Sequence, residues 1–81
     1  MLYNSEETKL IRALRRQIGQ NIHNARSRQK LTLRKLSKYT GLSPEMLDKY
    51  EVGKEEIDLR EIVKISLVLK VNIDQLLSLS A

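Results

Sequence analysis

The 81-residue sequence has no cysteine, tryptophan or phenylalanine, a single proline and only three glycines. Without cysteine, disulfide frameworks and thiolate metal sites are excluded, which fits a reducing compartment, so we expect a cytoplasmic location. Three tyrosines are too few for the stacked-base platforms of single-strand and RNA-binding proteins. The sequence also lacks the start of a signal peptide and any apolar run of about 18 residues, so we expect no membrane-spanning segment.

Acidic residues are absent from a long stretch of the first half. Ten basic residues occur there without one carboxylate among them: Lys9, Arg12, Arg15, Arg16, Arg26, Arg28, Lys30, Arg34, Lys35 and Lys38. From Tyr39 onward, eight acidic residues outnumber five basic ones. This asymmetry indicates a polyanionic partner, either nucleic acid or an anionic membrane surface. The alternative is an ordinary solvated helix face. We favour nucleic acid over a membrane surface, because the basic segment lacks Trp or Phe anchors.

Residues that could carry catalysis or bind a metal are also scarce. His23 is the single histidine, so we expect no metal site and interpret it as an exposed helix residue. Glu55, Glu56 and Asp58 form an acidic cluster in a predicted loop, where no surrounding pattern indicates a cavity. No serine or threonine has a plausible base nearby, and no glycine-rich phosphate loop occurs. We therefore expect neither an enzyme nor a bound cofactor.

The N-terminal part of the sequence predicts an amphipathic helix. Asn4 followed by Glu7 has the spacing of a capping box. Apolar residues then recur at steps of three and four: Leu10, Ile11, Leu14, Ile18, Ile22 and Ala25. Gly19 lies inside this pattern, so the segment is either one long helix to about Gln29 or two helices that meet near Gly19.

Four more capping signals, one of them followed by proline, predict four further helices. Thr32 opens a short helix that Thr40 and Gly41 end, and Ser43-Pro44-Glu45 opens a second one that runs to about Val52. Asp58 with Glu61 opens a third helix to about Lys70, and Asn72 with Gln75 opens a last short one. The third helix is expected to turn five residues inward: Leu59, Ile62, Ile65, Ser66 and Leu69. The sequence therefore predicts an all-α fold of five helices with an N-terminal helical extension.

The two short helices joined by residues 40–43 have the layout of a helix-turn-helix. Leu42, Leu47 and Tyr50 are placed to face the core, while the start of the second helix is polar and faces outward. In a helix-turn-helix, the N-terminal part of the second helix enters the major groove of DNA.

A longer string of residues is more specific than this turn alone. It reads Ile18-Gly19…Ile22…Arg26…Leu31-Thr32…Leu36-Ser37…Gly41-Leu42-Ser43…Leu47…Glu51-Val52-Gly53-Lys54…Leu59…Ile62…Ile65…Leu69-Lys70-Val71…Leu76-Leu77. This string closely resembles the phage-repressor family of helix-turn-helix proteins, also called Xre or Cro-like, over about residues 18–78. The resemblance implies a five-helix DNA-binding domain over residues 18–81, preceded by the extension at residues 1–17, and a regulator that binds double-stranded DNA as a homodimer.

The resemblance also implies roles for particular positions. Arg26 and Glu51 match a structural ion pair of the family. Phosphate contacts fall on Thr32, Leu33, Arg34 and Lys54, and base contacts on Ser43, Pro44, Glu45, Asp48 and Lys49. The chain departs from the family in having Leu33 where glutamine is common, and carboxylates at positions 45 and 48. Carboxylates can accept a hydrogen bond from cytosine, but they also repel phosphate.

The C-terminal half carries more apolar residues than an inner face needs. Since this region often forms the dimer contact in the family, we expect a dimer interface at Val63, Leu67, Val68 and Leu79. The function favoured is a transcriptional regulator, specifically a repressor. The alternative is an antitoxin-like or adaptor module that keeps the fold, binds DNA weakly and meets a protein partner such as a toxin. For residues 1–17 the sequence leaves three alternatives: the segment docks on the core, exchanges between subunits or lies along DNA.

Overall fold

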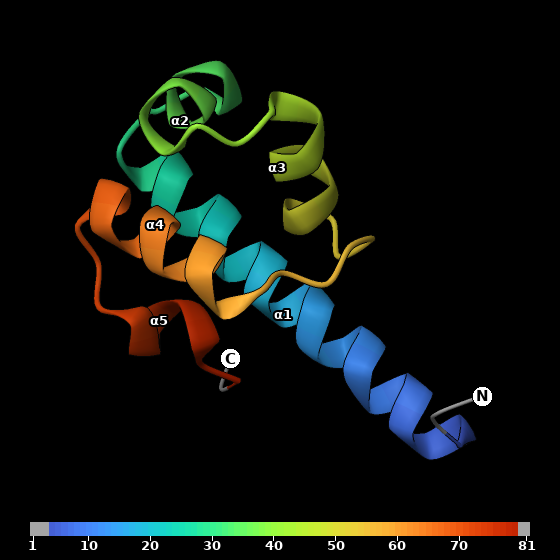
Figure 1. Cartoon of the computed structure of the whole chain (residues 1–81). Helices are drawn as coiled ribbons and strands as arrows, with labels where there is room; N and C mark the ends of the chain where they lie inside the picture. The colour runs from blue at the N-terminus through green and yellow to red at the C-terminus, as the bar shows by residue number, and fades with distance from the viewer. Residues whose placement is uncertain (1–3, 80–81) are drawn as a thin grey trace.

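The computed structural model describes residues 4–79 and folds them into five α-helices (Figure 1). They are α1 (Ser5–Arg28), α2 (Leu33–Thr40), α3 (Pro44–Glu51), α4 (Leu59–Leu69) and α5 (Ile73–Leu77). No strand occurs within this range. The all-α, five-helix prediction is therefore confirmed. None of these helices is both long and apolar enough to cross a membrane.

Side-chain caps fix where the helices begin, at the residues that the sequence predicts. The Asn4 side chain accepts a hydrogen bond from the Glu7 amide at 2.8 Å, and the Glu7 carboxylate accepts one from the Asn4 amide at 3.1 Å. Thr32, Ser43 and Asp58 likewise accept hydrogen bonds from amides three residues later. These bonds satisfy backbone donors that have no partner inside the helix.

α1 is one continuous helix, so the alternative of two helices meeting near Gly19 is wrong. Gly19 is buried where α1 crosses the end of α3. A Cβ atom at this position would lie 2.2 Å from the Tyr50 carbonyl oxygen and 2.6 Å from that of Glu51. The glycine therefore permits a close helix contact and does not break the helix. The predicted N-terminal extension and the first helix expected from the family resemblance form one continuous helix. The N-terminal part of this helix projects beyond the other helices (Figure 1).

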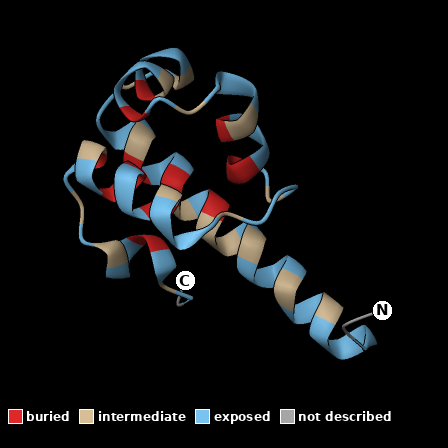
Figure 2. Cartoon of the chain, viewed as in Figure 1, coloured by how far each residue is buried: buried red, intermediate tan, exposed pale blue. Residues whose placement is uncertain are grey.

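The core lies between the second half of α1 and the other four helices. It is formed by nine buried residues: Ile22, Ala25, Leu36, Leu47, Tyr50, Ile62, Ile65, Leu69 and Leu76. In Figure 2 the buried positions of α1 are confined to its second half. Leu10 and Leu14, which the apolar pattern of α1 also included, are 64% and 39% exposed. Amphipathic periodicity therefore continues along α1 beyond the part that the core covers.

One core prediction is wrong, because Leu59 is 73% exposed. The other four predicted inner residues of α4 are buried: Ile62, Ile65, Ser66 and Leu69. Leu59 is the first residue of α4, and steps of four place it in line with Val63 and Leu67 on the neighbouring face. All three are exposed, and together they form an apolar row along the outside of α4.

Candidate nucleic-acid interface

α2 and α3 are joined by a tight turn that depends on glycine and threonine. Gly41 has φ 81°, the left-handed region that glycine adopts without steric cost, and its amide donates to the Ser37 carbonyl at 2.8 Å. The buried Thr40 hydroxyl donates to the Leu36 carbonyl at 2.8 Å and accepts from the Leu42 amide at 3.2 Å. These bonds hold the start of α3 at a fixed angle to α2.

α3 has one buried side and one exposed side. Leu47 and Tyr50 are buried in the core, as the sequence predicts, and the Tyr50 hydroxyl donates to the Glu61 carboxylate. Burial, with a smaller contribution from this hydrogen bond, raises the pKa of Tyr50. The outward side is exposed and consists of the five predicted base-reading residues: Ser43, Pro44, Glu45, Asp48 and Lys49. The helix is thus anchored on one side and free to contact a ligand on the other.

Arg26 and Glu51 form the ion pair that the resemblance implies. Arg26 Nε donates to Glu51 Oε2 at 2.7 Å, and Nη2 donates to Oε1 at 2.9 Å. The remaining guanidinium nitrogen, Nη1, donates to the Leu31 carbonyl at 2.7 Å. The hydrogen bond to Glu51 raises the pKa of Arg26 and outweighs the opposing effect of burial. The pair ties the last part of α1 to the end of α3.

His23 belongs to the same cluster, which the sequence interpretation missed. Its Nδ1 lies 3.0 Å from Glu51 Oε1 and 3.3 Å from Arg26 Nη2, although the side chain is 48% exposed. Its spacing of three residues from Arg26 places both on one helix face, and this was the signal available in the sequence. His23 thus forms the exposed edge of an otherwise buried polar cluster.

A hollow of about 480 Å³ opens beside this cluster, where three helices meet. Its lining comprises Arg16, Gln20, His23 and Arg26 from α1, Leu33 from α2, and Asp48 and Glu51 with Val52 at the end of α3. Among the predicted DNA-contacting residues, the structure brings Leu33 and Asp48 together here. An extended surface therefore runs from α1 across the start of α2 to the outer side of α3.

Two predicted contact residues also serve as helix caps. Thr32 Oγ1 accepts from the Lys35 amide at 3.1 Å, and Ser43 Oγ accepts from the Met46 amide at 3.0 Å. Each hydroxyl keeps its own proton, which can donate to an external acceptor such as a phosphate oxygen. Arg34 is exposed in the first turn of α2, two residues after the Thr32 cap.

Lys49 and Lys54 are linked at the end of α3 through their backbones. The Lys54 amide donates to the Lys49 carbonyl at 2.9 Å, and Gly53 between them has φ 79°. This is the Schellman arrangement of a helix C-terminus. Both lysine side chains are exposed, but neither lines the hollow that Leu33 and Asp48 share.

Comparison with known proteins identifies this arrangement of helices. The family described as "Helix-turn-helix" matches residues 22–76. The chain belongs to this helix-turn-helix family. A solved structure with the same fold is that of the restriction-modification controller protein C.AhdI from Aeromonas hydrophila, with a TM-score of 0.73 and 23% sequence identity. The match covers 75% of this chain and 92% of that one. None of the curated proteins matches the chain. The resemblance to the phage-repressor family is confirmed.

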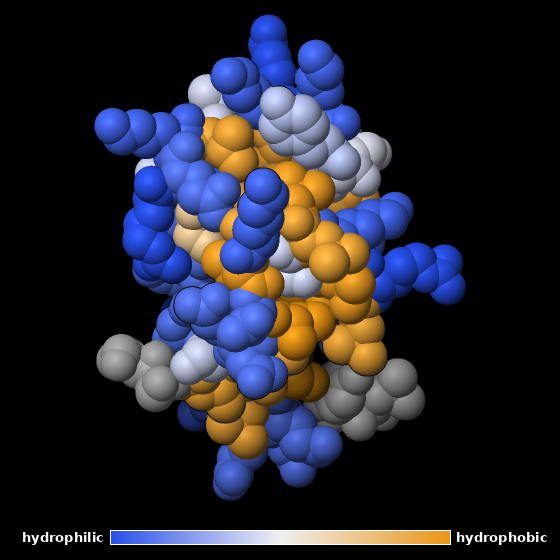
Figure 3. All heavy atoms as spheres, turned by 90° about the vertical axis from the view of Figure 1, so that its left-hand side faces the viewer, coloured by the Kyte–Doolittle hydropathy of each residue, from blue (hydrophilic) through white to orange (hydrophobic). Residues whose placement is uncertain are grey.

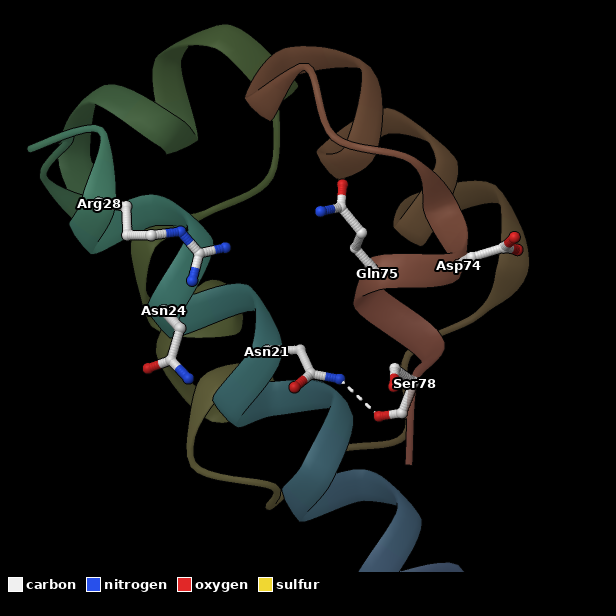
Figure 4. A pocket seen from close by; sticks show the side chains of 6 residues that line it. All are labelled: Asn21, Asn24, Arg28, Asp74, Gln75 and Ser78. Atoms are coloured by element: carbon white, nitrogen blue, oxygen red, sulfur yellow. Dashed lines mark hydrogen bonds between the residues drawn. The ribbon is translucent and has the colours of Figure 1, made fainter. Parts of the chain in front are cut away.

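A second hollow of this helix-turn-helix protein lies between α1 and α5 (Figure 4). It is lined by Asn21, Asn24, Arg28, Asp74, Gln75 and Ser78. The Asn21 amide donates to the Leu76 carbonyl at 2.9 Å and to the Ser78 carbonyl at 2.8 Å. This side chain thus caps the end of α5, whose last carbonyls have no helical partner. The hollow is part of the joint that holds α5 against α1.

Proposed function

We propose that the chain is a sequence-specific, double-stranded DNA-binding transcriptional regulator that reads base edges with the first turns of α3. The observation that carries this proposal is the two-sided character of α3. Its inner side is anchored by Leu47, Tyr50 and the Glu51 ion pair, while its outer side is free. Family membership supports DNA binding, because helix-turn-helix proteins place this helix in the major groove.

The positions proposed for DNA contact are those that the family resemblance implies, and all of them except the half-buried Leu33 are exposed. Thr32, Leu33 and Arg34 at the start of α2, together with Lys54 after α3, contact phosphates. The exposed residues of α3 read bases: Ser43, Pro44, Glu45, Asp48 and Lys49. Glu45 or Asp48 selects a cytosine by accepting a hydrogen bond from its amino group. Binding of this kind represses transcription by occupying the site, and it requires no catalysis, metal or cofactor.

We propose that the protein acts as a homodimer through the outer face of α4. A single short helix reads few base pairs, so a two-fold dimer on an inverted repeat gives the needed specificity. Leu59, Val63 and Leu67 provide an exposed apolar row there, and Figure 3 shows apolar surface gathered on this face of the molecule. Val68 is half-buried beside this row, and Leu79 near the C-terminus is 60% exposed. The row adds Leu59 to the four interface residues expected from the sequence.

Three biological settings fit such a protein: repression in a phage or mobile element, control of a restriction system, and autoregulation by an antitoxin. The shared fold with a restriction-modification controller supports the second setting.

A second candidate function is suggested by the charge of α3. Glu45 and Asp48 are three residues apart on its exposed side, with Lys49 as the nearby cation. Such a face suits a basic protein partner, for example a toxin, as in an antitoxin-like or adaptor module with weak DNA binding.

Selection of duplexes from a random DNA pool separates these candidates. The wild type should enrich an inverted repeat whose half-sites lie about one helical turn apart. Glu45→Gln should relax or change the preference at one fixed base pair by about 1–3 kcal/mol. Asp74→Asn removes the same charge from α5, away from this surface, and should leave the motif unchanged. If the wild type enriches no motif at low salt, the adaptor function replaces the regulator function.

A further inference from the structure

Three basic side chains form a stripe along the projecting part of α1. Lys9, Arg12 and Arg16 are spaced by three and four residues, so they share one face of the helix. All three are exposed. The ion pairs found in residues 4–79 converge on Glu51, and none involves these three residues. The stripe is therefore available to an anion outside the chain.

The stripe leads directly into the proposed DNA-binding surface. Arg16 lines the hollow that also contains Leu33 and Asp48. Its Cγ atom lies 2.9 Å from where a Cβ atom on Gly53 would sit, so the stripe passes beside the turn that precedes Lys54. The apolar side of α1 points elsewhere, since Ile11, Leu14 and Ile18 share a separate groove with Tyr50.

The charge of α3 explains why such a stripe is needed. Glu45 and Asp48 face outward with only Lys49 to offset them, so the reading helix cannot supply net attraction for phosphates. Most of the affinity of a DNA-binding protein comes from basic residues that neutralise phosphates and release counterions. Those residues must therefore lie on neighbouring elements, and the acid-free run that begins at Lys9 provides them.

We propose that Lys9, Arg12 and Arg16 bind backbone phosphates of the same duplex, just outside the half-site that α3 reads. This inference rests on the proposed function. Seven residues separate the two ends of the stripe, about 10 Å along the helix axis, and phosphates recur about every 3.4 Å of duplex axis on each strand. Its length therefore spans about three successive phosphate steps of one strand. The projecting part of α1 is thus a second, sequence-independent contact with DNA.

The test compares two duplexes that carry the same selected site. One ends at the edge of the site, and the other continues for about one helical turn on each side. Affinity is measured by fluorescence anisotropy over a range of salt concentrations. The variant is Lys9→Gln with Arg12→Gln; Arg16 is left unchanged because its stem packs beside Gly53. The matched control is Arg28→Gln with Lys64→Gln, which removes the same charge from exposed positions outside the proposed surface.

The wild type should bind the longer duplex about tenfold more tightly at low salt. Its slope of log affinity against log salt should be steeper on that duplex by about two per subunit. Lys9→Gln with Arg12→Gln should lose most of both gains and keep only the part that Arg16 supplies, whereas the control pair should keep them in full. Equal behaviour of the two variants, or no gain of the wild type from the flanks, would overturn the inference while leaving the proposed function intact.

A membrane surface is the other polyanion to which a basic helix can bind, and vesicles of phosphatidylserine and phosphatidylcholine provide it. If the Lys9 and Arg12 changes abolish binding to these vesicles but leave the flank effect on DNA unaltered, the stripe belongs to a membrane surface and the inference is wrong. Failure of the wild type to enrich any DNA site would instead reject the proposed function itself, and the inference with it.

Discussion

Glu51 is a carboxylate whose side chain is only 5% exposed, and Arg26 compensates for its removal from water. Removing Arg26 leaves the buried Glu51 carboxylate with only the half-exposed His23 beside it, and removing Glu51 leaves Arg26 with only the Leu31 carbonyl and His23. Arg26→Ala or Glu51→Ala should therefore each lower the free energy of unfolding by about 3–5 kcal/mol. The double replacement Arg26→Met with Glu51→Met should recover much of that loss, because no charge remains buried. Urea unfolding of the single and double variants measures this coupling. Small, additive losses would contradict it.

Tyr50 should make stability depend on alkaline pH. Burial raises the pKa of its hydroxyl above the unfolded value of about 10, so the folded chain holds this proton more tightly. The stabilisation is complete below pH about 10 and declines as the pH rises further. Tyr50→Phe cannot titrate, and at neutral pH it should cost about 0.5–1.5 kcal/mol through the lost bond to Glu61.

The difference in free energy of unfolding between wild type and Tyr50→Phe should therefore shrink above pH about 10. Tyr39→Phe is the matched control, because it removes the same hydroxyl from a tyrosine that is 60% exposed. A constant difference for Tyr50→Phe would show that the hydroxyl does not titrate differently on folding.

At the residue scale, the sequence predicted side-chain contacts only where a local spacing or the family resemblance indicated them. The pairing of Arg26 with Glu51 came from the resemblance, since 25 positions separate them and no local spacing connects them. His23 was missed, because its contact with Glu51 depends on how α1 crosses α3. Leu59 was assigned to the wrong face, because the first residue of a helix lies at the margin of its apolar stripe.

At the scale of elements, Gly19 determines how closely α1 and α3 approach. Gly19→Ala would place a methyl group against the Tyr50 and Glu51 carbonyls, and backbone atoms cannot rotate away. We expect a loss of about 1–3 kcal/mol from overpacking. A gain of about 0.8–1 kcal/mol in helix propensity opposes this loss. Thermal melts report the sum. A Gly19→Ala chain as stable as the wild type would mean that the two helices can separate without cost.

Gly41→Ala provides a comparison with a different cause. Nothing lies within 4 Å of a Cβ atom there, but φ is 81°. Its loss should therefore be about 1–2 kcal/mol from backbone strain alone.

Element boundaries were predictable because caps act over three residues. Asn4, Thr32, Ser43 and Asp58 all begin helices at the predicted places. The choice between one and two N-terminal helices was not predictable. Gly19 is needed because it packs against the Tyr50 carbonyl on α3, and the two residues are 31 positions apart in the sequence. The positions assigned to DNA contact remain predictions, because the fold of the protein does not determine which of its exposed residues touch the DNA.

At the scale of the whole molecule, the outer face of α4 should control assembly. Leu67→Gln should convert a dimer to a monomer in sedimentation and leave the melting temperature of the monomer unchanged, because Leu67 is 71% exposed. Leu10→Gln is the matched control, since Leu10 is 64% exposed on α1 and should not affect assembly. A wild type that sediments as a monomer at micromolar concentration would contradict the proposed homodimer.

The proposed boundary between an extension at residues 1–17 and a DNA-binding domain at residues 18–81 falls inside α1. Residues 1–3 and 80–81 of these two segments lie outside the described residues. Family membership supports the later segment, because the match covers residues 22–76. The earlier one contacts the rest of the fold through the side that carries Ile11 and Leu14, and through Arg16, whose stem packs beside Gly53.

The continuity of α1 has a consequence for hydrogen exchange. The amides around Ile22 and Ala25 belong to the buried core, so they exchange with solvent only when the whole domain unfolds. Beyond the Asn4 cap, the amides of the projecting turns are protected by helical bonds alone, so they should exchange through local fraying at a rate that does not depend on global stability. One uninterrupted helix is therefore divided into two units of local stability, with the transition near the first buried position, Gly19.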